Sequence, residues 1–172
     1  MPEADPNIFA FIKPSLDAHT LGINAAAELL RDCGYTVLFA DETISEAMNH
    51  YRNEINRKMV LDWIRSNRVG RIGLSYRLDQ DEAIAMVGYF MTELQKNKML
   101  SYQGGPIKAV YYGGLPQACK IIEKEHKGFV KTFQGGESAR ESLEKMGVPE
   151  ARIPKGILKG CAYDDSREIG RA

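Results

Sequence analysis

The sequence predicts an α/β fold in which helices cover both faces of a doubly wound, five-stranded parallel sheet. Short apolar runs without polar alternation are typical of strands that are buried on both faces. Each run is followed by a segment whose apolar residues recur at helical spacing. The connections between these segments are short, as in β/α units that wind in one direction. A chain of 172 residues suits one such domain.

Strands and helices alternate through the first half of the chain. In order, a strand, a helix, a strand and a helix are expected over 8–12, 22–32, 35–40 and about 51–66. Gly34 follows the first helix as a stop signal. In the second helix an apolar residue recurs every four positions, which predicts a core-facing side formed by Ile55, Met59 and Trp63.

The second half of the chain repeats this pattern. Strands are expected over 71–75, 107–112 and 129–133, and helices over 81–97, 115–127 and 137–146. The longest helix carries a single apolar face, made of Ala83, Val87, Phe90, Met91 and Leu94. Gly113 and Gly114 follow the fourth strand and are expected to end it.

The composition after Pro149 changes to proline, glycine, lysine and aspartate without a sustained period. We therefore expect residues 1–149 to form the domain and residues 150–172 to form a C-terminal tail or linker. Residues 164–172 show no closing helix or strand, which suggests a domain taken from a longer enzyme.

Charge and cysteine content exclude several classes of function. Lysine plus arginine equals aspartate plus glutamate at 23 each, so no basic field favours nucleic acid or a membrane surface as a partner. The first residues lack the pattern of a signal peptide, and no apolar run is long enough to span a membrane, so a cytoplasmic protein is expected. The three cysteines, Cys33, Cys119 and Cys161, are widely spaced, which favours reduced thiols over a disulfide framework or a zinc site.

Unusual residues follow the first, third and fourth predicted strands, where a doubly wound sheet binds its ligands. The first of these loops contains Asp17, His19 and Gly22, the third contains Ser75 and Leu78, and the fourth contains Gly113 and Gly114. A histidine two residues after an aspartate has the composition of a metal ligand and its hydrogen-bonding partner. Taken singly, each residue also suits a helix start or a turn, and only their joint placement favours a binding site.

The Asp17-x-His19-x-x-Gly22 pattern resembles the motif of cobalamin (vitamin B12) binding domains of the methionine synthase and methylmalonyl-CoA mutase type. The Gly113-Gly114 pair after the fourth strand also matches that family, whereas the third loop reads Ser-x-x-Leu in place of Ser-x-Leu. The resemblance covers about residues 8–147 and implies a flavodoxin-like, Rossmann-like fold.

This resemblance implies a role for each matched residue. His19 would replace the cofactor's own dimethylbenzimidazole as the lower axial ligand of cobalt, and Asp17 would orient and tune that histidine. The displaced nucleotide tail would lie in a slot, and the residues implied for the slot and its entrance are Gly22, Ser75, Leu78, Gly113 and Gly114. The implied cofactor is adenosylcobalamin or methylcobalamin.

The resulting hypothesis is a cobalamin-binding domain or small subunit that serves a B12-dependent mutase-type isomerase. The substrate site would lie on a partner catalytic subunit or domain. One alternative is the N-terminal B12-binding domain of a cobalamin-dependent radical SAM or methyl-transfer enzyme. No helical segment precedes residue 8, which disfavours the methyl-carrying corrinoid proteins. The other alternative is a flavodoxin-like binding or regulatory module without B12.

Two further segments border the predicted site. Tyr76 and Arg77 lie in the third loop, where they could contact the corrin's amide edge or a partner protein, or remain solvated. Gly135-Gly136-Glu137-Ser138 precedes a helix, but the charge of Glu137 opposes a bound anion there, so helix capping is the expected role.

Overall fold

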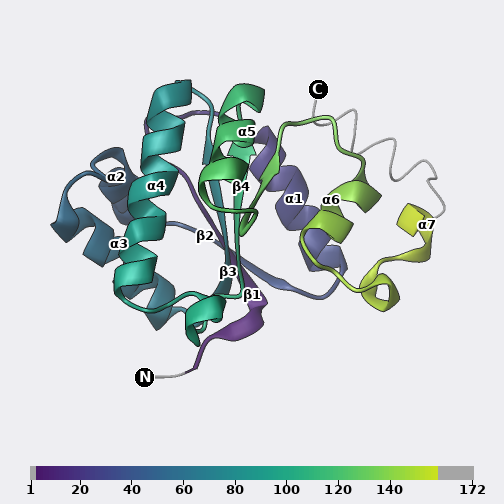
Figure 1. Ribbon diagram of the computed structural model, residues 1–172. Helices are drawn as coiled ribbons and strands as arrows, with labels where there is room; N and C mark the ends of the chain where they lie inside the picture. The colour runs from purple at the N-terminus through teal and green to yellow at the C-terminus, as the bar shows by residue number, and fades with distance from the viewer. Residues whose placement is uncertain (1–2, 159–172) are drawn as a thin grey trace.

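The computed structural model describes residues 3–158 and contains a five-stranded, all-parallel sheet (Figure 1). The strand order is β2-β1-β3-β4-β5, which is the flavodoxin-like order of doubly wound folds. The strands are β1 (Asp5–Ile12), β2 (Thr36–Phe39), β3 (Val69–Tyr76), β4 (Ala109–Gly114) and β5 (Val130–Phe133). The predicted fold class is confirmed.

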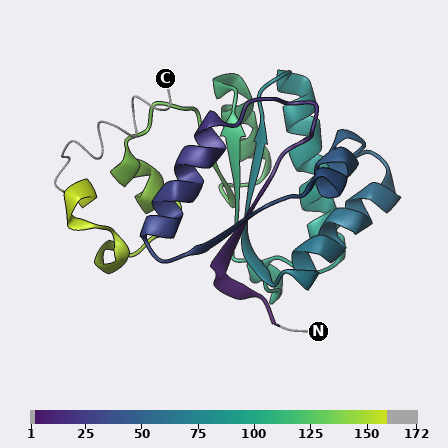
Figure 2. The same ribbon diagram turned by 180° about the vertical axis from the view of Figure 1, so that it is seen from behind.

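Helices cover the two faces of the sheet unequally (Figures 1 and 2). One face is covered by α2 (Glu42–Asn49), α3 (Glu54–Ser66), α4 (Gln80–Lys96) and α5 (Pro116–Glu125). The other face is covered by α1 (Leu21–Asp32), α6 (Ala139–Lys145) and α7 (Lys155–Leu158). Short 3-10 helices lie at η1 (Ser101–Gln103) and η2 (Glu150–Arg152). The face covered by α2 to α5 is called the four-helix face, and the face covered by α1, α6 and α7 is called the α1/α6 face.

The alternation of side chains along the central strand explains why the two faces differ. Ile72 and Leu74 of β3 point to the four-helix face and belong to its core. The residues that alternate with them along β3 point to the α1/α6 face and offer it no apolar side chain; they are Arg71, Gly73 and Ser75. The α1/α6 core is consequently built from the neighbouring strands and from the helices themselves.

Helix α4 buries the predicted residues, whereas α3 corrects its prediction. Ala83, Val87, Phe90, Met91 and Leu94 are all buried, as the spacing predicted. In α3 the predicted core-facing side was wrong at Ile55, which is 73% exposed, and at Met59, which is also exposed, whereas Trp63 is partly buried and packs against the core. The core contacts come from Val60, Leu61 and Ile64. Helix α2, which precedes α3, was not predicted; Asp41 caps it by accepting a hydrogen bond from the Ile44 N–H at 2.9 Å.

The described chain continues its packing beyond the expected end of the domain. Ile153 and Ile157 are buried in the core of the α1/α6 face. The Arg152 guanidinium lies 3.7 Å from the centre of the Tyr35 ring, and its Nε donates to the Cys33 carbonyl at 3.0 Å. The first part of the expected tail is thus a folded element. The remainder, with Cys161 and residues 164–172, lies outside the described residues.

Candidate functional site

The carboxyl ends of β1, β3, β4 and β5 lie at one edge of the sheet, and the loops that follow β1, β3 and β5 border a pocket there. The pocket has a volume of about 510 Å³ and lies on the α1/α6 face. This volume is within the range of small-molecule sites. Its lining comes from α1, α6, four strands and three loops: Phe11, His19, Thr20, Leu21, Gly22, Ile23, Ala26, Gly73, Leu74, Ser75, Arg77, Tyr111, Gly113, Phe133, Gln134, Gly135, Gly136, Glu137, Ser142 and Met146.

The pocket is hollow because side chains become small toward the carboxyl end of the sheet. Gly73 pairs with Tyr111 across β3 and β4, and Ser75 pairs with Gly113. A Cβ atom on Gly113 would have its nearest neighbour, the Phe133 carbonyl oxygen, at 3.9 Å, so space lies above this residue. A Cβ atom on Gly73 would lie 2.5 Å from the Phe11 ring, so the missing side chain of Gly73 leaves room for that ring on the α1/α6 face.

Asp17 and His19 form a hydrogen-bonded pair at the mouth of the pocket. The Asp17 side chain is completely buried, whereas that of His19 is 57% exposed. Asp17 Oδ1 lies 2.6 Å from His19 Nδ1 and also accepts the His19 backbone N–H at 3.0 Å. The other oxygen, Oδ2, accepts the backbone N–H of Arg77 at 2.7 Å. The carboxylate therefore joins the first and third loops.

The surroundings of Asp17 favour its ionised form. Burial raises the pKa of this carboxyl, but the hydrogen bonds from His19 and Arg77 outweigh burial and leave the pKa below its ordinary value. An ionised Asp17 holds a proton on His19 Nδ1, which leaves Nε2 as the nitrogen with the lone pair. Nε2 makes no hydrogen bond within residues 3–158. An imidazole held in this way is typical of metal-ligating histidines.

The structure brings most of the predicted site residues together. His19, Gly22, Ser75 and Gly113 line the pocket, and Asp17 holds His19. Leu78 and Gly114 are predicted site residues that do not line it.

Leu78 and Gly114 have other surroundings. Leu78 is 51% exposed in the loop before α4. A Cβ atom on Gly114 would lie 2.0 Å from the Tyr112 hydroxyl oxygen and 2.4 Å from the Tyr76 carbonyl oxygen, on the four-helix side. The prediction that Gly114 follows the fourth strand was wrong, because Gly114 is the last residue of β4 and pairs with Tyr76. Its missing side chain permits close packing on the four-helix side.

Sequence reasoning missed the aromatic floor and the α6 wall of the pocket. Phe11, Tyr111 and Phe133 form the floor, and the Tyr111 hydroxyl donates to the Met146 carbonyl at 2.8 Å. Ser142 and Met146 form the wall and are four residues apart on one helical face. That spacing, and the alternation of Tyr111 with Gly113 along β4, were the available signals.

The loop between β5 and α6 is organised by its own carboxylate. Glu137 accepts the backbone N–H groups of Gln134 and Gly135, both at 2.9 Å. Ser138 caps α6, because its hydroxyl oxygen accepts the Glu141 N–H at 3.0 Å. The Glu141 carboxylate in turn accepts the Ser138 N–H at 3.3 Å. The expected capping role of this segment is confirmed.

Comparison with known proteins finds no protein-family model that matches this chain and no curated protein that matches it. Within residues 3–158, no three histidine, cysteine, aspartate or glutamate side chains are grouped as a metal-binding set. Over the same range, every helix is too short or too polar to cross a membrane. The pocket is therefore the feature of the described residues that bears most on function.

Proposed function

We propose that this chain binds a cobalamin in the pocket on the α1/α6 face, with His19 Nε2 as the lower axial ligand of cobalt. It would act as the B12-carrying domain or small subunit of a mutase-type enzyme whose substrate site lies on a partner catalytic subunit or domain. One observation supports this most: a histidine held by a buried carboxylate stands at the mouth of the pocket, which forms a slot with open space above Gly113.

The donor set and the cavity fit this cofactor. Cobalt accepts imidazole nitrogen well, and His19 has one nitrogen engaged by Asp17 and the other without a bond to the described residues. The slot extends from His19 to Met146, between α1 and α6, which suits a flat aromatic group on a flexible tail. When bound, cobalamin supplies the cobalt–carbon bond on which its chemistry depends.

Each chain residue would have a separate part in holding the cofactor. Asp17 retains the Nδ1 proton of His19 and increases the donor strength of Nε2. Ile23 beside the slot and Phe133 in its floor give it apolar surfaces that exclude water. Ser75, whose hydroxyl has no hydrogen bond within the described residues, is placed to bond the polar part of the tail.

Retention of cofactor tests the proposal directly. Purified protein is mixed with hydroxocobalamin and separated from free cofactor by gel filtration. We expect a red protein fraction at one cofactor per chain. A colourless protein at saturating cofactor would overturn cobalamin binding and favour a flavodoxin-like module that uses the pocket for another ligand.

Ligation by His19 is tested by electron paramagnetic resonance of the cobalt(II) form. In protein labelled with nitrogen-15, the nitrogen splitting changes from a triplet to a doublet only when the axial nitrogen comes from the protein. We expect this doublet in the natural chain and its loss in His19→Ala. His50→Ala is the matched control, because His50 is an exposed histidine on another part of the surface. A doublet that survives in His19→Ala would exclude His19 as the ligand.

A further inference from the structure

Arg77 projects into the pocket from the loop after β3. Its backbone N–H donates to Asp17 Oδ2 at 2.7 Å, so the position of this residue is fixed by the carboxylate that also holds His19. Its side chain is half-buried and lines the pocket. A Cβ atom on Gly135 would lie 3.5 Å from Arg77 Nη2, which places the guanidinium against the loop between β5 and α6.

The guanidinium of Arg77 differs from every other arginine in residues 3–158. Each of the others donates at least one side-chain hydrogen bond, and they are Arg31, Arg52, Arg57, Arg65, Arg68, Arg71, Arg140 and Arg152. The Arg77 guanidinium makes no hydrogen bond or ion pair with the described part of the chain. A partly buried guanidinium without an anion has lost water without gaining a partner, which favours binding of an anionic ligand.

The other charged side chains of the pocket are already engaged. The Glu137 carboxylate accepts the two backbone N–H groups of its own loop and lies 3.8 Å from Lys145. His19 is bonded to Asp17. Because Glu137 occupies the free amides of the loop, an anion that enters the pocket finds its cationic partner at Arg77. The planar guanidinium presents several donors in a geometry that matches phosphate oxygens.

We propose that Arg77 binds the phosphate group of the ligand that occupies this pocket. This inference rests on the proposed function for the source of that phosphate, which would be the phosphodiester of the cobalamin nucleotide tail. Arg77 and His19, both fixed by Asp17, would then hold two parts of one ligand: a phosphate and a metal.

Paired probes isolate the phosphate contact. Affinities are measured spectrophotometrically for cobinamide phosphate and for cobinamide, which differ by the phosphate group. We expect the natural chain to prefer cobinamide phosphate by roughly 10- to 100-fold, the range of a charge-assisted hydrogen bond. Arg77→Gln should bind both compounds equally, and Arg77→Lys should retain part of the preference as a point charge. Arg65→Gln, on α3, is the matched control and should keep the full preference.

The outcomes separate this proposal from the proposed function. If Arg77→Gln keeps the preference, or if the natural chain has none, Arg77 does not bind the phosphate. If neither corrinoid binds, cobalamin binding is wrong, and the comparison is repeated with flavin mononucleotide and riboflavin. A preference for the phosphorylated flavin that disappears in Arg77→Gln supports Arg77 with a different ligand, and any other result overturns it. Equal thermal unfolding midpoints for all variants show that folding is unchanged.

Discussion

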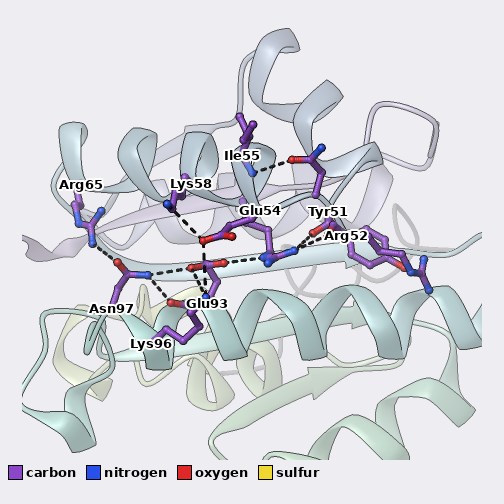
Figure 3. Close-up of polar contacts among 11 residues, drawn as sticks. Tyr51, Arg52, Glu54, Ile55, Lys58, Arg65, Glu93, Lys96 and Asn97 are labelled. Carbon is purple, nitrogen blue, oxygen red and sulfur yellow. Dashed lines mark hydrogen bonds and ion pairs between the residues drawn. The ribbon is translucent and has the colours of Figure 1, made fainter.

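The two faces of the sheet each bury a carboxylate, but they use it differently. On the four-helix face, Glu93 is 2% exposed and receives Arg57 Nε at 2.8 Å and Asn97 Nδ2 at 3.2 Å. Lys96 lies 3.9 Å away, and Figure 3 shows Glu93, Lys96 and Asn97 joined in this network. Burial raises the pKa of Glu93, but these partners outweigh burial and leave the pKa below its ordinary value. The charges of this group are satisfied within the protein.

On the α1/α6 face the corresponding carboxylate, Asp17, is bonded to a residue that is incompletely satisfied. Its partner His19 lies at the mouth of the pocket and has a nitrogen, Nε2, that makes no hydrogen bond with the described residues. The guanidinium of its other partner, Arg77, makes no hydrogen bond or ion pair with them. A closed network contributes to folding alone. A network that is open in this way can accept a molecule from outside the chain, which is the role proposed above for Asp17 and His19.

The largest expected effect concerns the closed network. Arg57→Ala removes the main partner of Glu93 and should lower the free energy of unfolding by about 3–5 kcal/mol, the cost of leaving one member of a buried ion pair unpaired. Urea unfolding measures it. The control, Lys58→Ala, removes only an exposed pair with Glu54 and should cost less than about 1 kcal/mol. Equal effects of the two substitutions would show that Glu93 is not held as described.

The adjacent glycines of β4 allow the two faces to be tested separately, because a side chain at Gly113 and one at Gly114 would point to opposite faces of the sheet. Gly114→Ala should destabilise the protein by about 1–3 kcal/mol, because the new Cβ meets the Tyr76 carbonyl oxygen at 2.4 Å. Gly113→Ala should leave stability unchanged or slightly increased, since its Cβ enters open space. Thermal unfolding checks both, and similar destabilisation by both would contradict the assignment of faces.

Replacement of Asp17 should affect cobalamin binding more than folding. Asp17→Asn keeps the size of the side chain but removes the charge that orients His19. Cobalamin affinity should fall roughly 10- to 100-fold, as for other hydrogen-bonding partners of metal-ligating histidines. Titration of hydroxocobalamin measures it, with Glu93→Gln as the control on the closed network. A binding loss as large in Glu93→Gln would remove the distinction between the two carboxylates.

The smallest expected effect is a pH dependence. Because the pKa of Asp17 in the folded protein is below its ordinary value of 3.8, this carboxylate stabilises the fold above that pH. The contribution is lost as pH falls from 3.8 through the folded pKa. The stability difference between the natural chain and Asp17→Asn should therefore shrink between neutral pH and pH values below 3.8. Glu93 is present in both proteins, so its pH-dependent contribution to stability cancels in the difference. A constant difference would indicate an unshifted Asp17.

The sequence was sufficient for the sheet and for the centre of the site. Apolar runs mark buried strands, and parallel topology then brings the loops of Asp17, Ser75 and Gly113 to one edge. The predictions that were wrong concern features that tertiary packing determines. Ile55 is exposed because α3 packs against the core through another side, and the separate roles of Gly113 and Gly114 depend on where β4 ends. A doublet of identical residues carries no information about which one faces the ligand.

The double use of the Asp17 carboxylate has a consequence for communication within the molecule. Its two oxygens bond His19 on one side and the backbone of Arg77 on the other, and Arg77 is 60 positions from Asp17 in the chain. A displacement of either loop therefore also displaces this carboxylate. In the proposed complex, any free energy by which contact at His19 changes binding at Arg77 equals the free energy by which contact at Arg77 changes binding at His19.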